Sequence, residues 1–234
     1  MRKTITVTTI LLTLSACSGS DAPAPAAVNE FDHIMVGIAE LDAGMEILAD
    51  LTGVTPAHGG IHPGRDTRNA LLSLGGGTYF ELIAPQANLQ TITDPIALAT
   101  LAYQTPTPMH WAVRTTDIEA TKAMVESAGW TTTPIDARSR QTPDGGLLSW
   151  QMFFVAEADD AASIPFFIQW DAQSQHPSQT SPDGCTFDKL TISTPETERI
   201  DTLLDTLGLA IEIQASAQDS LALEISCGGS TLEF

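Results

Sequence analysis

Basic residues are scarce in this sequence, which has 10 lysines and arginines against 29 aspartates and glutamates and a formal net charge of −19. A chain this acidic is not expected to bind nucleic acid or to dock electrostatically on anionic lipid. Long apolar runs are also missing, because the stretch at residues 5–14 covers about ten residues and is too short to span a bilayer. Apolar residues as a class are not scarce, and at 43% of the chain they are sufficient for a proper core.

The N-terminus has the pattern of an export signal, with Arg2 and Lys3 before the apolar stretch and small residues after it. Leu14-Ser15-Ala16-Cys17 resembles the lipobox of bacterial lipoproteins, in which the cysteine is lipidated and becomes the new N-terminus. We therefore expect a lipoprotein signal peptide at residues 1–16, lipidation of Cys17 and a Pro/Ala/Ser-rich tether at residues 17–30. The expected location is the cell envelope on the periplasmic side, and Ser18 favours the outer membrane. A plain secreted protein is the alternative.

Removal of residues 1–16 leaves 8 basic against 29 acidic residues, a net charge of −21. Most of the remaining cations are arginines in the middle of the chain. They are Arg65, Arg68, Arg114, Arg138 and Arg140. In so acidic a chain, this clustering of arginines indicates that they serve a function at one site of the molecule.

The folded part is expected to begin with an apolar strand at residues 31–38. Leu41 and Leu48 follow at helical spacing, and Gly53 ends that helix. Two apolar runs that flank a triple glycine then predict a hairpin at residues 68–85.

The same order of elements recurs. A strand at residues 108–115 precedes a helix at 117–128, and further strands are expected near 131–136, 147–155 and 165–170. His33 and His110 each lie eight residues before the first apolar residue of their helix, so the two histidines occupy equivalent positions.

A third, shorter copy closes the chain, with Lys189 in the place of His33. Units of four strands and one helix should each form a curved sheet with the helix on its outer face. We therefore expect an α+β fold in which paired βαβββ modules form a cupped half-barrel, with a third partial unit. The expected boundaries are residues 31–107, 108–180 and 181–234.

Glu81 lies inside an apolar strand of the hairpin, between Phe80 and Leu82. A carboxylate in a strand that should be buried needs a cation, a partner or a hydrogen-bond network.

Several motifs occur in order along the first two modules. They include Phe31-Asp32-His33-Ile34, Asn69-Ala70-Leu71-Leu72, Tyr79-Phe80-Glu81-Leu82 and His176-Pro177. Together they resemble the glyoxalase-like branch of the vicinal-oxygen-chelate superfamily over roughly residues 31–180. The resemblance implies a divalent metal in the cup, held by side chains from the first and last strands of each module.

Carried onto this sequence, the resemblance implies the metal ligands His33, Glu81, His110 and Gln169, with Glu81 also as catalytic base. Two imidazoles and one carboxylate suit Zn, Fe, Ni, Co or Mn. Gln169 stands where the superfamily has a second glutamate, and a neutral amide holds a metal less strongly and cannot act as a base. Core histidines and a buried ion pair at Glu81 are the alternative interpretation.

Five basic side chains fall in loops or at strand ends of the first two modules: His62, Arg65, Arg68, Arg138 and Arg140. Because guanidinium groups bind carboxylate or phosphate bidentately, we expect an anionic small molecule at the mouth of the cup. Salt bridges to the abundant acids are the alternative. Trp111, Trp150 and Trp170 are expected in the core, and a platform for stacking a ligand is the alternative.

Cys185 and Cys227 both belong to the third unit, and an exported protein meets an oxidising compartment. In a βαβββ unit the first and last strands are parallel and adjacent, which would bring these cysteines together. We expect a disulfide bond between them.

Two functions follow for this protein. The first is a divalent-metal-dependent lyase, isomerase or dioxygenase that acts on a small oxygenated molecule. The second is a metal-free protein that binds or sequesters a small molecule on the same fold. In either case the partner is a small-molecule ligand, contact with a membrane is made only through the lipid anchor, and the chain is a monomer or homodimer.

Overall fold

The computed structural model describes residues 27–156 and 161–234. The first module contains β1 (Asn29–Gly37), α1 (Leu41–Thr52), β2 (Ala57–Ile61), β3 (Thr67–Ser73) and β4 (Tyr79–Pro85). The second contains β5 (Thr107–Thr115), α3 (Ile118–Ser127), β6 (Asp136–Gln141), β7 (Leu147–Phe153) and β8 (Phe166–Trp170). Short helices lie after each module, α2 (Pro95–Thr100) and α4 (Pro177–Thr180). The third unit contains β9 (Cys185–Thr194), α5 (Thr197–Leu207), β10 (Glu212–Ala215), β11 (Ser220–Cys227) and β12 (Ser230–Glu233).

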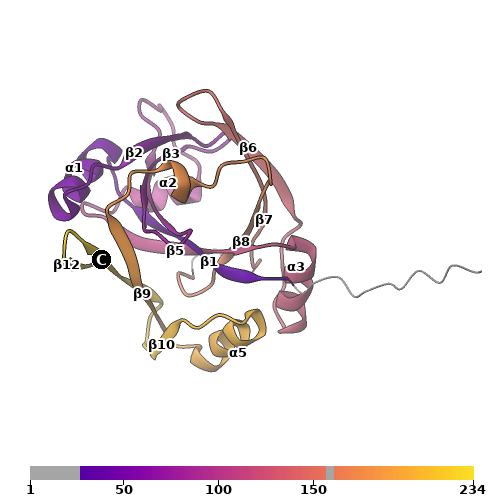
Figure 1. Ribbon diagram of the computed structural model, residues 1–234. Coiled ribbons are helices and arrows are strands. Elements are labelled where there is room, and N and C mark those ends of the chain that lie inside the picture. The colour runs from indigo at the N-terminus through magenta and orange to yellow at the C-terminus, as the bar shows by residue number, and fades with distance from the viewer. Residues whose placement is uncertain (1–26, 157–160) are drawn as a thin grey trace, which may run out of the picture.

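The two modules form one eight-stranded sheet with the order β2-β3-β4-β1-β5-β8-β7-β6. Each module pairs its first and last strands in parallel, and β1 and β5 join the modules by antiparallel pairing. The sheet curves until its edge strands β2 and β6 approach each other, so it is nearly closed (Figure 1). This architecture confirms the expected α+β fold with paired modules.

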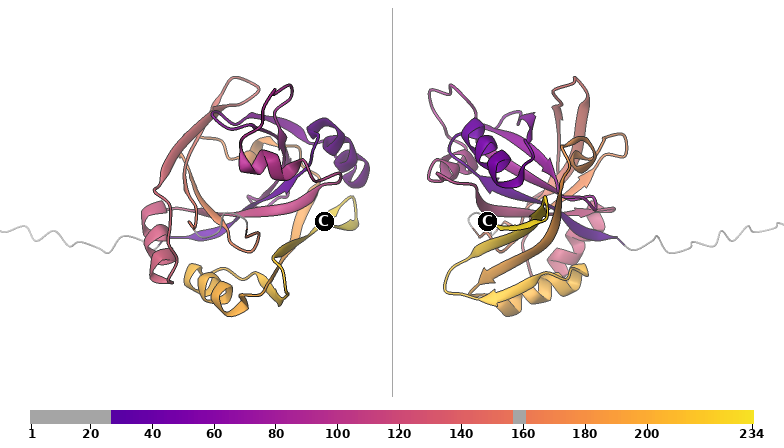
Figure 2. Two further views of the ribbon diagram at one scale, coloured as in Figure 1. Left: turned by 180° about the vertical axis from the view of Figure 1, so that it is seen from behind. Right: turned by 60° about the vertical axis from the view of Figure 1, so that its left-hand side comes forward.

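Helices α1 and α3 cover the outer face of this sheet, and the third unit packs on the outside as well (Figure 2). Gly44 of α1 permits a close approach, because a Cβ atom there would lie 2.9 Å from Leu82 of β4. Asp117 caps α3 by accepting a hydrogen bond from the backbone N–H of Ala120. The main core lies outside the sheet, which leaves its inner face available for a cavity. Within residues 27–156 and 161–234, no helix is long and apolar enough to cross a membrane.

The third unit has the expected order of elements but a different strand topology. Its sheet has the order β10-β9-β11-β12, so β9 pairs in parallel with β10 and not with the last strand. Cys185 and Cys227 form a disulfide bond because they face each other directly across antiparallel β9 and β11. The geometric reason given for this pairing from the sequence was therefore wrong. The unit contacts the main core through Phe187, which stacks on Phe31 with ring centroids 4.6 Å apart.

Two other expectations need correction. The strand expected near residues 131–136 is an isolated bridge between Thr132 and Val155, and the edge strand of the second module is β6, at Asp136–Gln141. The tether expected at residues 17–30 overlaps β1, which starts at Asn29 because Thr115 pairs with it across the sheet. Residues 1–16 and Cys17 lie outside the described residues.

Candidate functional site

The inner face of the curved sheet encloses a cavity of about 330 Å³, which we call the inner cavity. Its two walls differ in chemistry. The first-module wall carries polar and charged side chains: His33, His62, Arg65, Thr67, Asn69, Tyr79 and Glu81. The second-module wall is mostly apolar and aromatic: Leu148, Trp150, Met152, Phe154, Phe166, Ile168 and Trp170. Arg138, Ser139 and Arg140 of β6 also line the cavity, and the first-module side adds the apolar residues Met35, Leu71, Ile83 and Ile96. Cavities of this size and character commonly bind small molecules.

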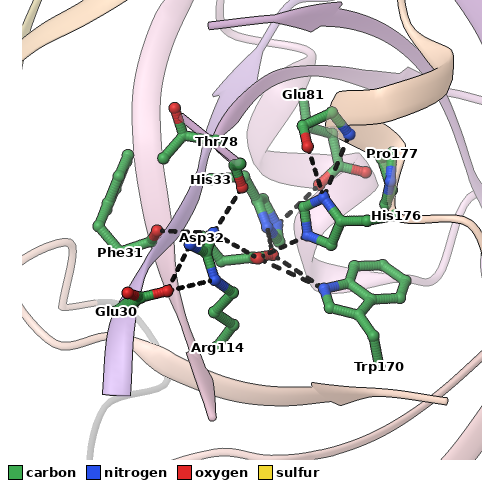
Figure 3. Close-up of polar contacts among 12 residues, drawn as sticks. Glu30, Phe31, Asp32, His33, Thr78, Glu81, Arg114, Trp170, His176 and Pro177 are labelled. Atoms are coloured by element: carbon green, nitrogen blue, oxygen red, sulfur yellow. Dashed lines mark hydrogen bonds and ion pairs between the residues drawn. The ribbon is translucent and has the colours of Figure 1, made fainter. Parts of the chain in front are cut away.

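Asp32 is a fully buried carboxylate at the centre of a hydrogen-bond network (Figure 3). It lies 2.8 Å from Nδ1 of His33 and 2.8 Å from Nε2 of His176, and the indole N–H of Trp170 donates to it at 3.3 Å. Nδ1 of His176 accepts from the backbone N–H of Ser178, so its Nε2 is the nitrogen that donates to Asp32. The network therefore joins β1 to β8 and to the start of α4.

Glu81 is held on the other side of His33. Its carboxylate accepts a 2.6 Å hydrogen bond from the amide of Asn69 and lies 3.4 Å from Nε2 of His33. Nε2 of His62 lies 3.5 Å away. His33 is thus sandwiched between two buried carboxylates, and it stacks on the ring of Tyr79 at 4.4 Å.

The protonation states follow from these contacts. Burial alone would lower the pKa of His33, but the carboxylates of Asp32 and Glu81 raise it to about 9. Burial would raise the pKa values of both acids. Hydrogen bonds from His176 and His33 instead lower the pKa of Asp32 to about 2. Contacts with His33, His62 and Asn69 lower the pKa of Glu81 to about 2. The wall therefore carries one imidazolium between two carboxylates at neutral pH.

His62 behaves differently from His33. Burial and the nearby arginines lower its pKa, although Glu81 opposes this shift. Its Nδ1 lies 2.8 Å from the hydroxyl of Thr67, and its Nε2 lies 3.2 Å from the amide nitrogen of Asn69. His62 is therefore a neutral imidazole beside a charged one.

The structure brings together His33 and Glu81 of the four expected metal ligands, and it does not bring in the other two. Gln169 projects from the opposite face of β8, where its side-chain oxygen accepts a 2.7 Å hydrogen bond from the backbone N–H of Ile118 at the start of α3. The residues of β8 that face the cavity are Phe166, Ile168 and Trp170. The sequence register was wrong by one residue, which on a strand reverses the direction of the side chain. His110 is not among the residues that line the inner cavity.

The expected substrate-binding residues also divide. His62, Arg65, Arg138 and Arg140 line the inner cavity, whereas Arg68 does not. Arg68 donates to the backbone oxygen of Pro85 and lies 3.5 Å from Asp42 of α1. It is a surface ion pair on the helix-covered side.

Sequence reasoning missed several residues of the site. Asp32 and His176 occur in the motifs that carry the resemblance but had no role assigned to them. Asn69 could have been found, because β3 pairs Leu71 with Glu81 and residues two apart on a strand share a face. Trp150 and Trp170 were expected in the core and instead line the cavity, while Trp111 is buried in the core as expected.

The side chains present do not fit the divalent metal site that the resemblance implies. Among the described residues, no group of three or more His, Cys, Asp or Glu side chains is arranged to hold a metal ion. The second-module wall offers Phe166 and Ile168 where ligands from the last strand would be needed. Both ring nitrogens of His33 already face carboxylates.

Sequence comparison places this architecture in a known family. The profile of the glyoxalase-like domain matches residues 31–208. The chain belongs to this family. The match covers both modules of this glyoxalase-like protein and extends into the third unit. It agrees with the resemblance to the vicinal-oxygen-chelate superfamily.

Solved structures agree with the fold. A hypothetical protein from Staphylococcus aureus superposes with a TM-score of 0.64 at 18% sequence identity, covering 88% of this chain and 99% of that one. Methylmalonyl-CoA epimerase from Mycobacterium tuberculosis matches with a TM-score of 0.45 at 21% identity, over 64% of this chain and 92% of that one. The match to the Staphylococcus aureus protein shows similarity of fold alone. Among curated proteins, none matches the chain.

Proposed function

We propose that this glyoxalase-like protein binds a small organic molecule in the inner cavity and holds it without a metal ion. The observation that supports this proposal is the contrast between the two walls. On the first-module wall Glu81 is engaged by Asn69 and His33, although the buried side-chain oxygen of Asn69 has no hydrogen-bond partner. Beside Arg138 and Arg140, the second-module wall presents aromatic and aliphatic surface without a metal ligand. Apolar surface facing a cavity favours an apolar ligand body.

The metal-dependent lyase, isomerase or dioxygenase expected from the sequence needs ligands from the second module. Gln169 is engaged with α3, and Glu81 has a pKa of about 2 and is already bound by Asn69 and His33. A carboxylate with so low a pKa is a weak general base. The proposal therefore assigns binding rather than catalysis to this cup.

The test is a fluorescence titration with N-phenyl-1-naphthylamine, an uncharged apolar probe, in the presence of EDTA. We expect saturable binding of one probe per chain, with affinity unchanged by removal of EDTA. Phe166→Ala should weaken the probe at least fivefold by removing ring surface from the cavity, while Gln151→Ala, an exposed position on β7, should not. No saturable binding, or equal affinity in Phe166→Ala and wild type, would overturn the proposal.

Metal content provides the second arm of the test. We expect substoichiometric metal in both the purified wild type and His33→Ala. One equivalent of a divalent metal in wild type that is lost in His33→Ala would favour the metal-dependent enzyme instead.

Export and anchoring are part of the same proposal. Leu14-Ser15-Ala16-Cys17 supports a lipid anchor on Cys17 at the periplasmic side of the cell envelope, with the outer membrane favoured. Full-length protein should take up radiolabelled palmitate and fractionate with membranes, and Cys17→Ser should do neither. Label in Cys17→Ser equal to that in wild type would contradict this assignment.

A further inference from the structure

Arg140 is the buried arginine of the cup. It lies on the edge strand β6 with 5% of its surface exposed. Its Nη1 donates a hydrogen bond to the backbone oxygen of Gly59 on β2, so it reaches across the seam between the two edges of the sheet. The glycines of β2 make room for it, because a Cβ atom on Gly60 would lie 3.2 Å from Nη1 of Arg140.

The charge of Arg140 has no carboxylate partner within ion-pair distance among the described residues. The other arginines of the described chain each have an acidic partner. These pairs are Arg65 with Asp94, Arg68 with Asp42, Arg114 with Glu30, Arg138 with Asp136 and Arg199 with Glu196. Burial lowers the pKa of Arg140, and Glu81 and Tyr79 oppose that shift only through longer-range charge effects. Glu81 shares the single imidazolium of His33 with Asp32.

A buried guanidinium without a counter-charge is costly, because the charge has lost water and gained no ion pair. In a chain with 29 acidic residues, the lack of an acid at this one buried arginine is informative. The fork of N–H donors matches a carboxylate or similar planar anion.

Arg140 also lies where two cavities meet. A second cavity of about 470 Å³, which we call the outer cavity, shares Arg140, Leu71, Leu148 and Pro177 with the inner cavity. The outer cavity is lined by polar side chains such as Thr142, Gln173 and Gln175. Asp144 also lines it, and its carboxylate accepts hydrogen bonds from Thr142 and Gly146.

We propose that Arg140 is the anion-binding residue of the cup, and that the ligand is an organic carboxylate with an aromatic or other apolar body. The carboxylate meets Arg140 at the seam, and the body lies in the inner cavity against Trp150 and Phe166. Any polar extension of the ligand enters the outer cavity. This inference rests on the proposed binding function and names the class of ligand.

The test compares two probes with the same ring system, 1-naphthoate and 1-naphthalenemethanol, by isothermal titration calorimetry at pH 7. Wild type should bind 1-naphthoate at least tenfold more tightly than the alcohol. Arg140→Met, which keeps an unbranched apolar side chain and removes the charge, should lose this preference and still bind the alcohol. Arg68→Met removes an arginine outside the cavity and should leave the preference unchanged.

Arg140→Lys provides a second variant should Arg140→Met fail to fold, as judged by circular dichroism. It retains the charge without the fork, and its preference should fall at least threefold. Equal binding of both probes by wild type would overturn the inference and leave the proposed function standing. Retention of the full preference in Arg140→Met, or in Arg140→Lys if only that variant folds, would also overturn it. Binding of neither probe would remove the inference together with the proposed function.

Discussion

The first strands of the two modules each contain a β-bulge, but the bulged residue is a charged carboxylate in one strand and an apolar side chain in the other. Strand β1 has a register shift at Asp32, and β5 has one at Met109. Each of these residues directly precedes the equivalent histidine, His33 or His110. Asp32 is buried and holds His33 and His176, whereas Met109 packs with Met35 and Ile83 in a small apolar cluster.

The third unit repeats the irregularity at Asp188, one residue before Lys189. There the carboxylate is exposed and accepts a hydrogen bond from Ser226, while Lys189 pairs with Glu212. A bulge thus recurs at one position of three units. The surroundings of the bulge depend on the residue in it and on how deeply that residue is buried. The bulge lies in a charged network at Asp32, in an apolar cluster at Met109 and on the solvated surface at Asp188.

The largest effect should come from the buried carboxylate. Asp32→Ala leaves His33 and His176 without their shared acceptor, and the loss of one partner from a buried ion pair costs about 3–5 kcal/mol of unfolding free energy. Asp188→Ala is the matched control at the equivalent, exposed position and should cost less than about 0.5 kcal/mol. Urea unfolding at pH 6 measures both. Similar small losses in the two variants would show that the Asp32 network adds little to stability.

The buried charged groups around His33 should also make the stability of the fold depend on pH. His33 has its folded-state pKa raised from 6.5 to about 9, so its contribution is fully present below pH 6.5 and is lost as the pH rises through about 9. Asp32 and Glu81 have theirs lowered from 3.8 and 4.5 to about 2, so their contributions are present above pH 4.5 and are lost as the pH falls through about 2. We expect these three groups to stabilise the fold most between about pH 4.5 and 6.5.

His33→Gln checks the alkaline side of this dependence. The variant should be less stable than wild type near pH 6, and its unfolding free energy should fall less between pH 6 and pH 9.5, because the group that loses its proton is gone. Urea unfolding at the two pH values gives the comparison. An equal alkaline loss in both proteins would assign the effect to other groups.

Apart from the control at Asp188, the smallest loss of stability is expected from substitution of Gln169, the residue that the sequence places as the second-module counterpart of Glu81. Gln169→Ala removes the acceptor for the Ile118 N–H and should cost about 1 kcal/mol, as the loss of a helix cap does. Binding of N-phenyl-1-naphthylamine should not change, because Gln169 does not line the cavity. A weakening of the probe by more than threefold would place Gln169 in the site after all.

The fold could be predicted largely from the sequence because helical spacing, the triple glycine and the repeat agree with one another. Residue identity also located half of the site, because Glu81 lies on a strand of the predicted hairpin and His33 lies on the parallel strand beside it. The prediction of the second half of the site failed at β8, because a shift of one residue along a strand turns a side chain from the cavity towards α3.

Two further features depend on contacts between distant segments. The sequence does not show that β9 would pair with β11, which sets the strand order of the third unit. It also does not show that His176 would donate to Asp32, 144 residues away. Both are set by packing between units rather than by any local pattern.

A crystal structure of the protein with 1-naphthoate tests the division of the cup most directly. We expect the carboxylate within hydrogen-bond distance of the Arg140 guanidinium and the rings against Phe166 and Trp150. His33 and Glu81 should keep their present contacts with Asp32 and Asn69. Naphthoate bound outside the inner cavity, or with its carboxylate directed away from Arg140, would contradict this account.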